Sequence, residues 1–192
     1  SLGALYADMP LGMTPRQYRA GGKDLVLEYD AVSTPYGILI VVTTAAGICF
    51  VGFADDEKEV LTVVQREYPA AQLSRALQRK HLTNAVHQLL DSHPNHDDIP
   101  LDIRATAFQQ RVWQALRAIP YGETRTYQQI ADSIDQPKAV RAVANACAQN
   151  PVAIIVPCHR VVHRDAKREG YRWSVVRKRA ILAHEHAVIS QE

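Results

Sequence analysis

Apolar runs typical of strands fill the start of the chain, whereas helical patterns dominate after about Arg104, and this difference divides the chain into two parts. In the first part, β-branched and apolar runs separated by turn residues predict three strands, at 25–32, 38–44 and 48–53. Later segments repeat apolar residues at helical spacing and predict two helices, at 58–68 and 82–90. The first part is therefore expected to be a small α/β unit that ends near residue 104.

The second part is expected to be mostly helical. Thr106 is placed to cap a helix that Pro120 stops. Two short helices follow, at 127–134 and 138–149, and the tight turn between them predicts a helix-turn-helix. The second of them is rich in alanine, which fits either close approach to another surface or packing in a core. After it, 152–156 is predicted to be a buried strand, so the chain as a whole is expected to be an α/β (α+β) protein.

The net charge of +2 conceals an asymmetry between the two parts. Residues 1–103 hold 8 Lys and Arg against 13 Asp and Glu, whereas residues 104–192 hold 14 against 7, a net charge of +7. A basic half is more often only a solvated surface, so charge alone does not identify a partner. It makes the second part the candidate to face a polyanion if motifs support that function.

Other features argue against several classes of protein. No apolar run approaches the roughly 18 residues of a membrane span, and Ser1–Pro10 lacks the regions of a signal peptide, so a cytoplasmic protein is expected. The three cysteines are an odd number without CxxC spacing, which argues against a disulfide framework and a thiolate zinc site. Four histidines lack a supporting ligand pattern and are expected to be exposed rather than metal-bound: His81, His87, His93 and His96.

Cys158 is the candidate residue for chemistry. Pro157 ends the apolar run before it, and His159 and Arg160 follow at once. An imidazole and a guanidinium group beside a thiol are expected to favour the thiolate over a thiol of pKa about 8.5. The other two cysteines, in an apolar strand and on the alanine-rich helix, lack such neighbours and are expected to be structural.

The segment Pro157–Val162 resembles the active-site motif of the O6-alkylguanine-DNA alkyltransferases, also called methylated-DNA--protein-cysteine methyltransferases. The resemblance extends from Thr106 to about Glu185 and includes four further segments, at 121–123, 127–129, 137–143 and 170–173. It implies an RNase H-like α/β domain over 23–104. It also implies a mostly helical, winged-helix-like domain over 105–192 that binds DNA and carries the alkyl acceptor.

The start of the chain carries a second resemblance. Residues 11–22 resemble the closing turn and helix of an AraC-type DNA-binding domain. We therefore expect residues 1–22 to be the remnant of an upstream domain of that type, with a linker beginning at Gly21-Gly22; a native N-terminal arm is the alternative. Together with Gly170–Trp173, this indicates the C-terminal half of a bacterial adaptive-response regulator, whose intact form also regulates transcription.

The resemblance implies roles at the reacting centre. Cys158 would be the nucleophile that takes the alkyl group. His159 would take the thiol proton through a water held toward Glu185. Tyr127 would donate a hydrogen bond to guanine N3 as charge develops on the departing base.

Other residues implied by the resemblance contact DNA or shape the pocket. Arg141 would fill the gap left by a flipped nucleotide, with its helix in the minor groove. Asn150 would tie the turn behind the active site, and Tyr171 would help to wall the pocket. Arg160 also belongs to the expected set of substrate-binding or DNA-binding residues.

The chain departs from the family pattern in one region. Residues 163–169 contain no glycine where the family usually has a glycine-rich loop. Ser174 stands where glycine is expected, and a positive φ angle there would be costly. Trp173 should narrow the pocket and favour methyl over bulky alkyl groups.

The function implied by the resemblance is direct reversal of DNA damage. An alkyl group would pass irreversibly from O6-alkylguanine, and from O4-methylthymine, in duplex DNA to Cys158. No cofactor and no metal is expected, and the chain is expected to act as a monomer. Two alternatives are a non-catalytic module that binds alkyl damage or controls transcription, and a cysteine hydrolase. The presence of Cys158 argues against a module that only binds, and a helix-turn-helix has no function in a cysteine hydrolase.

Overall fold

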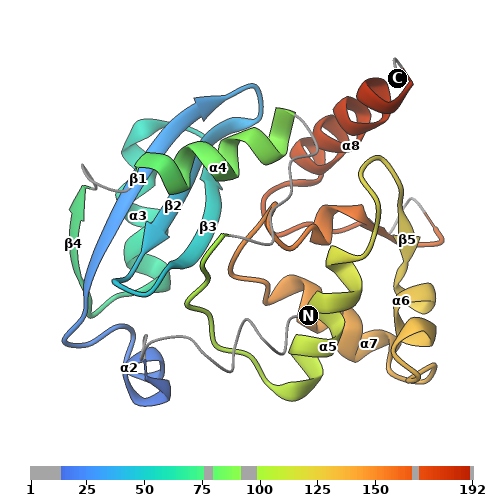
Figure 1. Ribbon diagram of the computed structural model, residues 1–192, viewed down its shortest axis with the longest axis horizontal. Coiled ribbons are helices and arrows are strands. Elements are labelled where there is room, and N and C mark those ends of the chain that lie inside the picture. The colour runs from blue at the N-terminus through green and yellow to red at the C-terminus, as the bar shows by residue number, and fades with distance from the viewer. Residues whose placement is uncertain (1–13, 76–79, 92–98, 166–168, 191–192) are drawn as a thin grey trace. The chain divides into compact units, whose positions relative to one another are not determined.

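The computed structural model describes residues 14–75, 80–91, 99–165 and 169–190 (Figure 1). They form two compact units, one drawn from Ser1–Leu89 and Pro94–Arg104 and the other from Leu90–His93 and Ala105–Glu192. The mixed α and β fold class predicted from the sequence is confirmed. Within the described ranges, no helix is both long and apolar enough to cross a membrane. Several predicted features lie outside the described residues: 1–13 of the expected remnant, His93, His96, and 166–168 of the glycine-poor loop.

A four-stranded sheet forms the centre of the first unit, in the order β3-β2-β1-β4. Its strands are β1 (Val26–Thr34), β2 (Gly37–Thr43), β3 (Ile48–Ala54) and β4 (Gln72–Arg75). The first three pair antiparallel, and β4 runs parallel to β1. In Figure 1, α4 (Lys80–Asp91) passes in front of the sheet and α3 (Glu57–Glu67) lies behind it. Because both faces are covered, β3 is buried along its whole length.

The predicted strands and helices of the first unit are confirmed, with small displacements at their ends. Strand β4 was not predicted. Its sequence, Gln-Leu-Ser-Arg, is short and polar, and its side chains are largely exposed at the edge of the sheet. Such a strand buries too little apolar surface to leave a pattern in the sequence.

Gly21 and Gly22 follow a short helix, α2 (Pro15–Arg19), and both have positive φ angles. The carbonyl of Gly21 accepts a hydrogen bond from the Ala70 amide at 2.9 Å. A Cβ atom on Gly21 would lie 2.8 Å from Cγ of Pro69, so only glycine fits without displacement. The pair is packed against the turn after α3.

Short elements of the second unit bring its motifs together. The helices are α5 (Ala107–Arg117), α6 (Tyr127–Ser133), α7 (Val140–Ala148) and α8 (Val175–Ile189). A 3-10 turn, η1 (Cys158–Arg160), leads into β6 (Val161–Val162), which pairs in parallel with β5 (Arg125–Thr126). Capping boxes at Thr106 and Thr126 begin α5 and α6. The β5-β6 pair therefore places the start of α6 beside the segment that follows Cys158.

Helices α6 and α7 form the predicted helix-turn-helix, and α5 supports it. The indole Nε1 of buried Trp113 donates to the carbonyl of Ala146 at 2.9 Å, which fixes α7 against α5. The alanine-rich helix is only partly buried in the core. Ala146 lies in the core, whereas Ala142 and Ala148 are exposed.

The segment 152–156 is buried, as predicted, but the predicted strand is wrong. The Val156 amide donates to the carbonyl of Val152 at 3.0 Å, so the backbone turns back on itself. Ile154 has a φ angle of 72°, an uncommon conformation for a β-branched residue. A continuous apolar run indicates that the segment is buried. It has no period that would distinguish a buried turn from a buried strand.

Ser174 precedes α8 with a φ angle of 83° and makes no side-chain capping hydrogen bond. The backbone at Ser174 therefore adopts the positive φ angle at which a residue other than glycine is strained, as the sequence led us to expect.

We expect Ser174→Gly to raise the free energy of unfolding by about 1 kcal/mol, because glycine adopts positive φ without a Cβ clash. Urea denaturation measures the change. Ser190→Gly is the control, because Ser190 ends α8 with a φ angle of −72° and should gain nothing. A lower urea midpoint for Ser174→Gly would contradict the expectation.

Candidate active site

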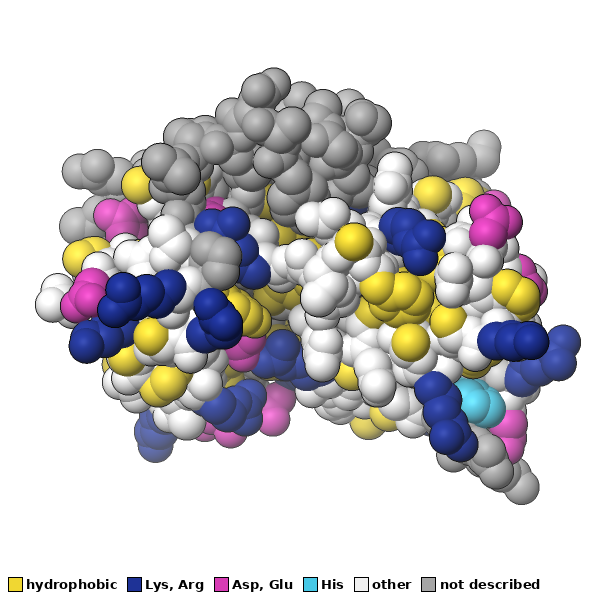
Figure 2. Space-filling view, turned by 90° about the horizontal axis from the view of Figure 1, so that it is seen from below, with side chains coloured by type: hydrophobic (Ala, Val, Ile, Leu, Met, Phe, Trp, Pro, Cys, Tyr) yellow, Lys and Arg dark blue, Asp and Glu magenta, His cyan; other side chains and the backbone are white. Residues whose placement is uncertain are grey.

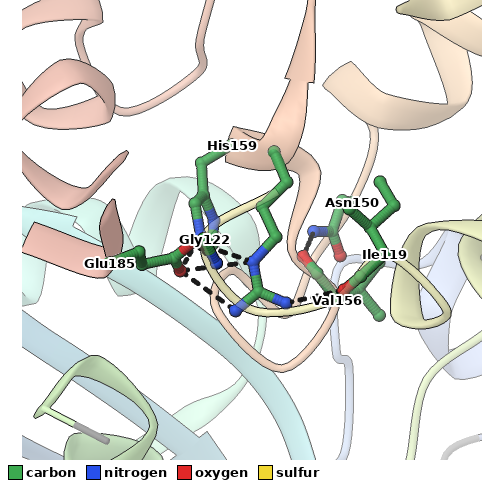
Figure 3. Close-up of polar contacts among 7 residues, drawn as sticks. Ile119, Gly122, Asn150, Val156, His159 and Glu185 are labelled. Atoms are coloured by element: carbon green, nitrogen blue, oxygen red, sulfur yellow. Dashed lines mark hydrogen bonds and ion pairs between the residues drawn. The ribbon is translucent and has the colours of Figure 1, made fainter. Parts of the chain in front are cut away.

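Cys158 begins the turn η1, and its thiol is buried. Asn150, just after α7, fastens this turn. Its Nδ2 donates to the carbonyl of Val156 at 2.8 Å and to Sγ of Cys158 at 3.2 Å (Figure 3 draws the first of these). Its Oδ1 accepts from the Val152 amide at 3.0 Å. One amide side chain therefore fixes both the sulfur and the turn that presents it.

The environment of Cys158 disfavours the thiolate form of its side chain. Burial raises its pKa above the usual value, and the Asn150 hydrogen bond with the cations Lys178 and Arg172 only partly opposes that effect. The expectation that the two following residues lower the pKa is wrong, because both are engaged by a carboxylate. The thiol therefore needs a base before it can attack.

Glu185, on α8, organises the groups next to Cys158 (Figure 3). Its carboxylate accepts from His159 Nε2 at 2.8 Å, from Arg160 Nε at 3.0 Å and from the Gly122 amide at 3.2 Å. Burial alone would raise the pKa of Glu185, but the hydrogen bonds from His159 and Arg160 outweigh it and lower that pKa to about 2. Glu185 is therefore ionised near neutral pH.

The carboxylate fixes the position of the proton on His159. Burial lowers the pKa of His159 despite the attraction of Glu185, so the imidazole is neutral near pH 7. Because an ionised carboxylate only accepts, Nε2 carries the proton and Nδ1 is an acceptor. Nδ1 is buried and makes no hydrogen bond to any part of the chain that the structure describes. The His159–Glu185 contact is direct, at 2.8 Å.

Arg160 takes a different place from the one expected for a substrate-binding or DNA-binding residue. It is buried, and its Nη1 donates to the carbonyl of Ile119 at 3.0 Å (Figure 3). Its guanidinium lies 5.1 Å from the centre of the Tyr121 ring and pairs with Glu185. The side chain is thus used inside the protein, where it neutralises and holds Glu185.

Two tyrosines implied by the resemblance lie close to the thiol. Tyr127 is the first residue of α6 and is half-buried. Burial, followed by the proximity of Cys147 and Cys158, raises the pKa of Tyr127 to about 12, so its phenol keeps its proton. The ring of Tyr171 lies edge-on to His159, with centroids 6.5 Å apart, and its hydroxyl is buried without a partner among the described residues. Both tyrosines therefore keep their hydroxyl protons and can donate hydrogen bonds.

Arg141 lies on the exposed side of α7, with small Ala142 and Ala148 also exposed on this helix. Lys138, in the turn before α7, is exposed as well. Figure 2 shows that Lys and Arg side chains are spread over one face of the molecule in separate groups, some beside carboxylates. The small exposed side chains of α7 leave room for close approach of another surface.

Lys178 is a site residue that sequence reasoning missed. It stands between Arg177 and Arg179 in α8, a setting typical of an exposed helix surface. In the structure it is buried, and its ammonium group donates to the carbonyl of Val161 at 2.7 Å. No local signal in the sequence distinguishes it from its neighbours.

Comparison with known proteins identifies the family to which the chain belongs. Residues 107–187 match the family model described as "6-O-methylguanine DNA methyltransferase, DNA binding domain". A methylated-DNA--protein-cysteine methyltransferase of Mycolicibacterium paratuberculosis is 39% identical over 83% of this chain and 93% of its own length. The solved structure of Mycobacterium tuberculosis OGT in complex with DNA is 34% identical, with a TM-score of 0.67 over 83% of this chain and 93% of that one. The chain therefore belongs to the methylated-DNA--protein-cysteine methyltransferase family.

Two further relatives in this family are about twice as long as the segment that this chain matches. The bifunctional transcriptional activator/DNA repair enzyme Ada of Escherichia coli is 46% identical over 93% of this chain. The match covers 51% of that relative, and the regulatory protein ada of Salmonella typhimurium is likewise matched over 51% of its length. The chain thus spans about half the length of these relatives.

Proposed function

We propose that this chain repairs alkylated duplex DNA by transferring the alkyl group of O6-alkylguanine, and of O4-methylthymine, to its own Cys158. The observation that carries the proposal is a buried thiol held by Asn150 and followed in the chain by a neutral imidazole whose orientation Glu185 fixes. A thiol whose pKa is raised by burial needs a general base to become a nucleophile, and His159 would be that base. A transcriptional function, like that in the name of E. coli Ada, belongs to the same proposal.

The proposed reaction is a single displacement. His159 Nδ1 accepts the proton of the Cys158 thiol, directly or through one water. Sγ then forms a bond to the alkyl carbon, the bond between that carbon and O6 breaks, and the electron pair of that bond stays with the guanine. Tyr127 donates a hydrogen bond to N3 of the base as negative charge develops on it. The products are a thioether and an unmodified guanine, which takes up a proton.

The proposed DNA contact uses α6 and α7. A base inside a duplex cannot reach a buried thiol, so the alkylated nucleotide has to rotate out of the stack. Exposed Arg141 would occupy the gap, and the small Ala142 and Ala148 would allow α7 to approach a minor groove closely. Asn150 and Tyr171 would then shape the pocket that receives the base.

The test is a titration with duplex DNA that carries labelled O6-methylguanine. A thioether is neither hydrolysed nor displaced under the conditions of an active site, so each molecule can react once. With excess DNA, the transferred label should plateau at no more than one methyl per molecule and be recovered as S-methylcysteine in the peptide that contains Cys158. Chelator and added S-adenosylmethionine should leave the plateau unchanged. Label beyond one equivalent, or label on Cys49 or Cys147, would overturn the proposal.

A further inference from the structure

Lys178 is a buried cation for which the proposed reaction has assigned no function. Only 1% of the residue is exposed. Its Nζ donates to the carbonyl of Val161 at 2.7 Å and to the carbonyl of Gly170 at 3.4 Å. Val161 directly follows η1, and Gly170 directly precedes Tyr171. One ammonium group thus connects the turn that carries the acceptor thiol with the segment that carries the pocket tyrosine.

The positive charge of Lys178 is only partly compensated by its carboxylate neighbour. Glu169 lies 3.8 Å from Nζ but binds Arg179 more closely, at 2.8 Å. By contrast, Arg160 meets Glu185 through several short hydrogen bonds. A buried cation with a shared counter-ion retains a field that acts on nearby groups, because little water screens it.

We propose that Lys178 is a positioning residue of the acceptor site, whose ammonium group stabilises the negative charge that forms on Sγ of Cys158 when the thiol proton leaves. The inference rests on the proposed function and assigns a residue to its first step. The titratable and charged groups that face Lys178 or Cys158 from the surrounding elements are Glu169, Cys147, His159, Arg172, Tyr127 and Tyr171. Of the two cations near the thiol, Lys178 is buried and Arg172 is exposed, so solvent screens Arg172 more strongly.

The charges balance over the proposed step. The proton passes from Sγ to Nδ1 of His159, which leaves an anion on Sγ and a cation on the imidazole beside ionised Glu185. Lys178 then faces the sulfur anion until the bond to the alkyl carbon forms. Consistent with this, burial raises the pKa of the Cys158 thiol while Asn150 and Lys178 lower it.

The experiment measures the alkylation rate of Cys158 by iodoacetamide between about pH 6 and 10, by mass spectrometry of the Cys158 peptide. This readout needs no DNA, so it tests Lys178 even if methyl transfer is not the function of the chain. Lys178→Met should move the midpoint of the pH profile upward. Near pH 7 it should slow alkylation about threefold, because the loss of thiolate exceeds the gain in intrinsic nucleophilicity. Lys178→Arg should restore most of the wild-type profile.

Two further variants keep the inference falsifiable. Arg179→Met removes the exposed partner of the same carboxylate and should leave the pH midpoint unchanged. Glu169→Gln leaves the ammonium without its counter-ion and should move the midpoint downward, so it tests the sign even if Lys178→Met does not fold. An unchanged midpoint in both Lys178→Met and Glu169→Gln would overturn the inference. If the midpoints move as expected but no variant or wild-type protein accepts methyl from DNA, the proposed function fails and the charge assignment stands.

Discussion

Cys158→Ala should abolish methyl transfer and leave the affinity for duplex DNA within about twofold of the wild type. The thiol is the proposed acceptor, and the variant removes it. Affinity, in contrast, is expected to come from phosphate and groove contacts made by α6, α7 and the basic residues of the second unit. Transfer of label from O6-methylguanine DNA measures the first quantity, and a fluorescence anisotropy titration measures the second.

Cys49→Ala provides the matched control. Cys49 is also a buried free thiol, but it lies in β3 of the first unit, and burial raises its pKa to about 12. This variant should retain full transfer per folded molecule. If Cys158→Ala lost DNA binding together with transfer, the residue would be needed for the shape of the interface and its assignment as the acceptor would be unsupported.

Glu185→Gln should lower the free energy of unfolding by about 3–5 kcal/mol and slow methyl transfer strongly. The variant leaves buried Arg160 without its counter-charge, and breaking one side of a buried ion pair is costly. It also removes the group that fixes the proton of His159 on Nε2. Urea denaturation gives the stability, and single-turnover kinetics with excess protein gives the rate.

Glu123→Gln is the control for the loss of a carboxylate as such. Glu123 pairs with Arg125 at 2.8 Å, and the two side chains are 50% and 39% exposed. An exposed ion pair contributes little, so this variant should lose less than about 1 kcal/mol. Equal losses in the two variants would show that the Glu185 network does not stabilise the fold.

The pH dependence of stability follows from the lowered pKa of Glu185. That pKa is about 2 in the folded chain against an ordinary value of 4.5, so the unfolded chain binds more protons between these limits. The stabilisation is therefore complete above about pH 5 and is lost as the pH falls toward 2. The stability difference between wild type and Glu185→Gln should shrink over that interval. A difference that is constant from pH 7 to pH 3 would contradict the ion-pair interpretation.

Much of the fold could be predicted from local sequence, because periodicity and capping act locally. The strands of the first unit and the helix-turn-helix of the second are where the apolar spacing and the Thr106 cap indicate them. The turn at 152–156 could not be predicted, because its apolar side chains report burial without reporting backbone direction. Strand β4 was missed for the opposite reason, since an exposed polar edge has no apolar period.

The candidate site also contains residues that could be predicted from local sequence and residues that could not. Cys158 was identified from its immediate neighbours and a motif, both of which are local. The behaviour of Arg160 and Lys178 depends on contacts with residues far away in the chain, Ile119 and Glu185 for the first and Val161 for the second. A basic residue next to a nucleophile can face the sulfur, a carboxylate or solvent, and only the tertiary structure decides between them.

Helix α8 supplies both Glu185 and Lys178, and it is the last element of the described chain. During synthesis on a ribosome, η1 and its cysteine therefore emerge before the groups that orient His159 and face the sulfur. A nascent chain that stops short of α8 carries a thiol with no fixed base and no buried cation beside it. In the proposed reaction, the acceptor thiol is therefore given its oriented base only after α8 has been synthesised.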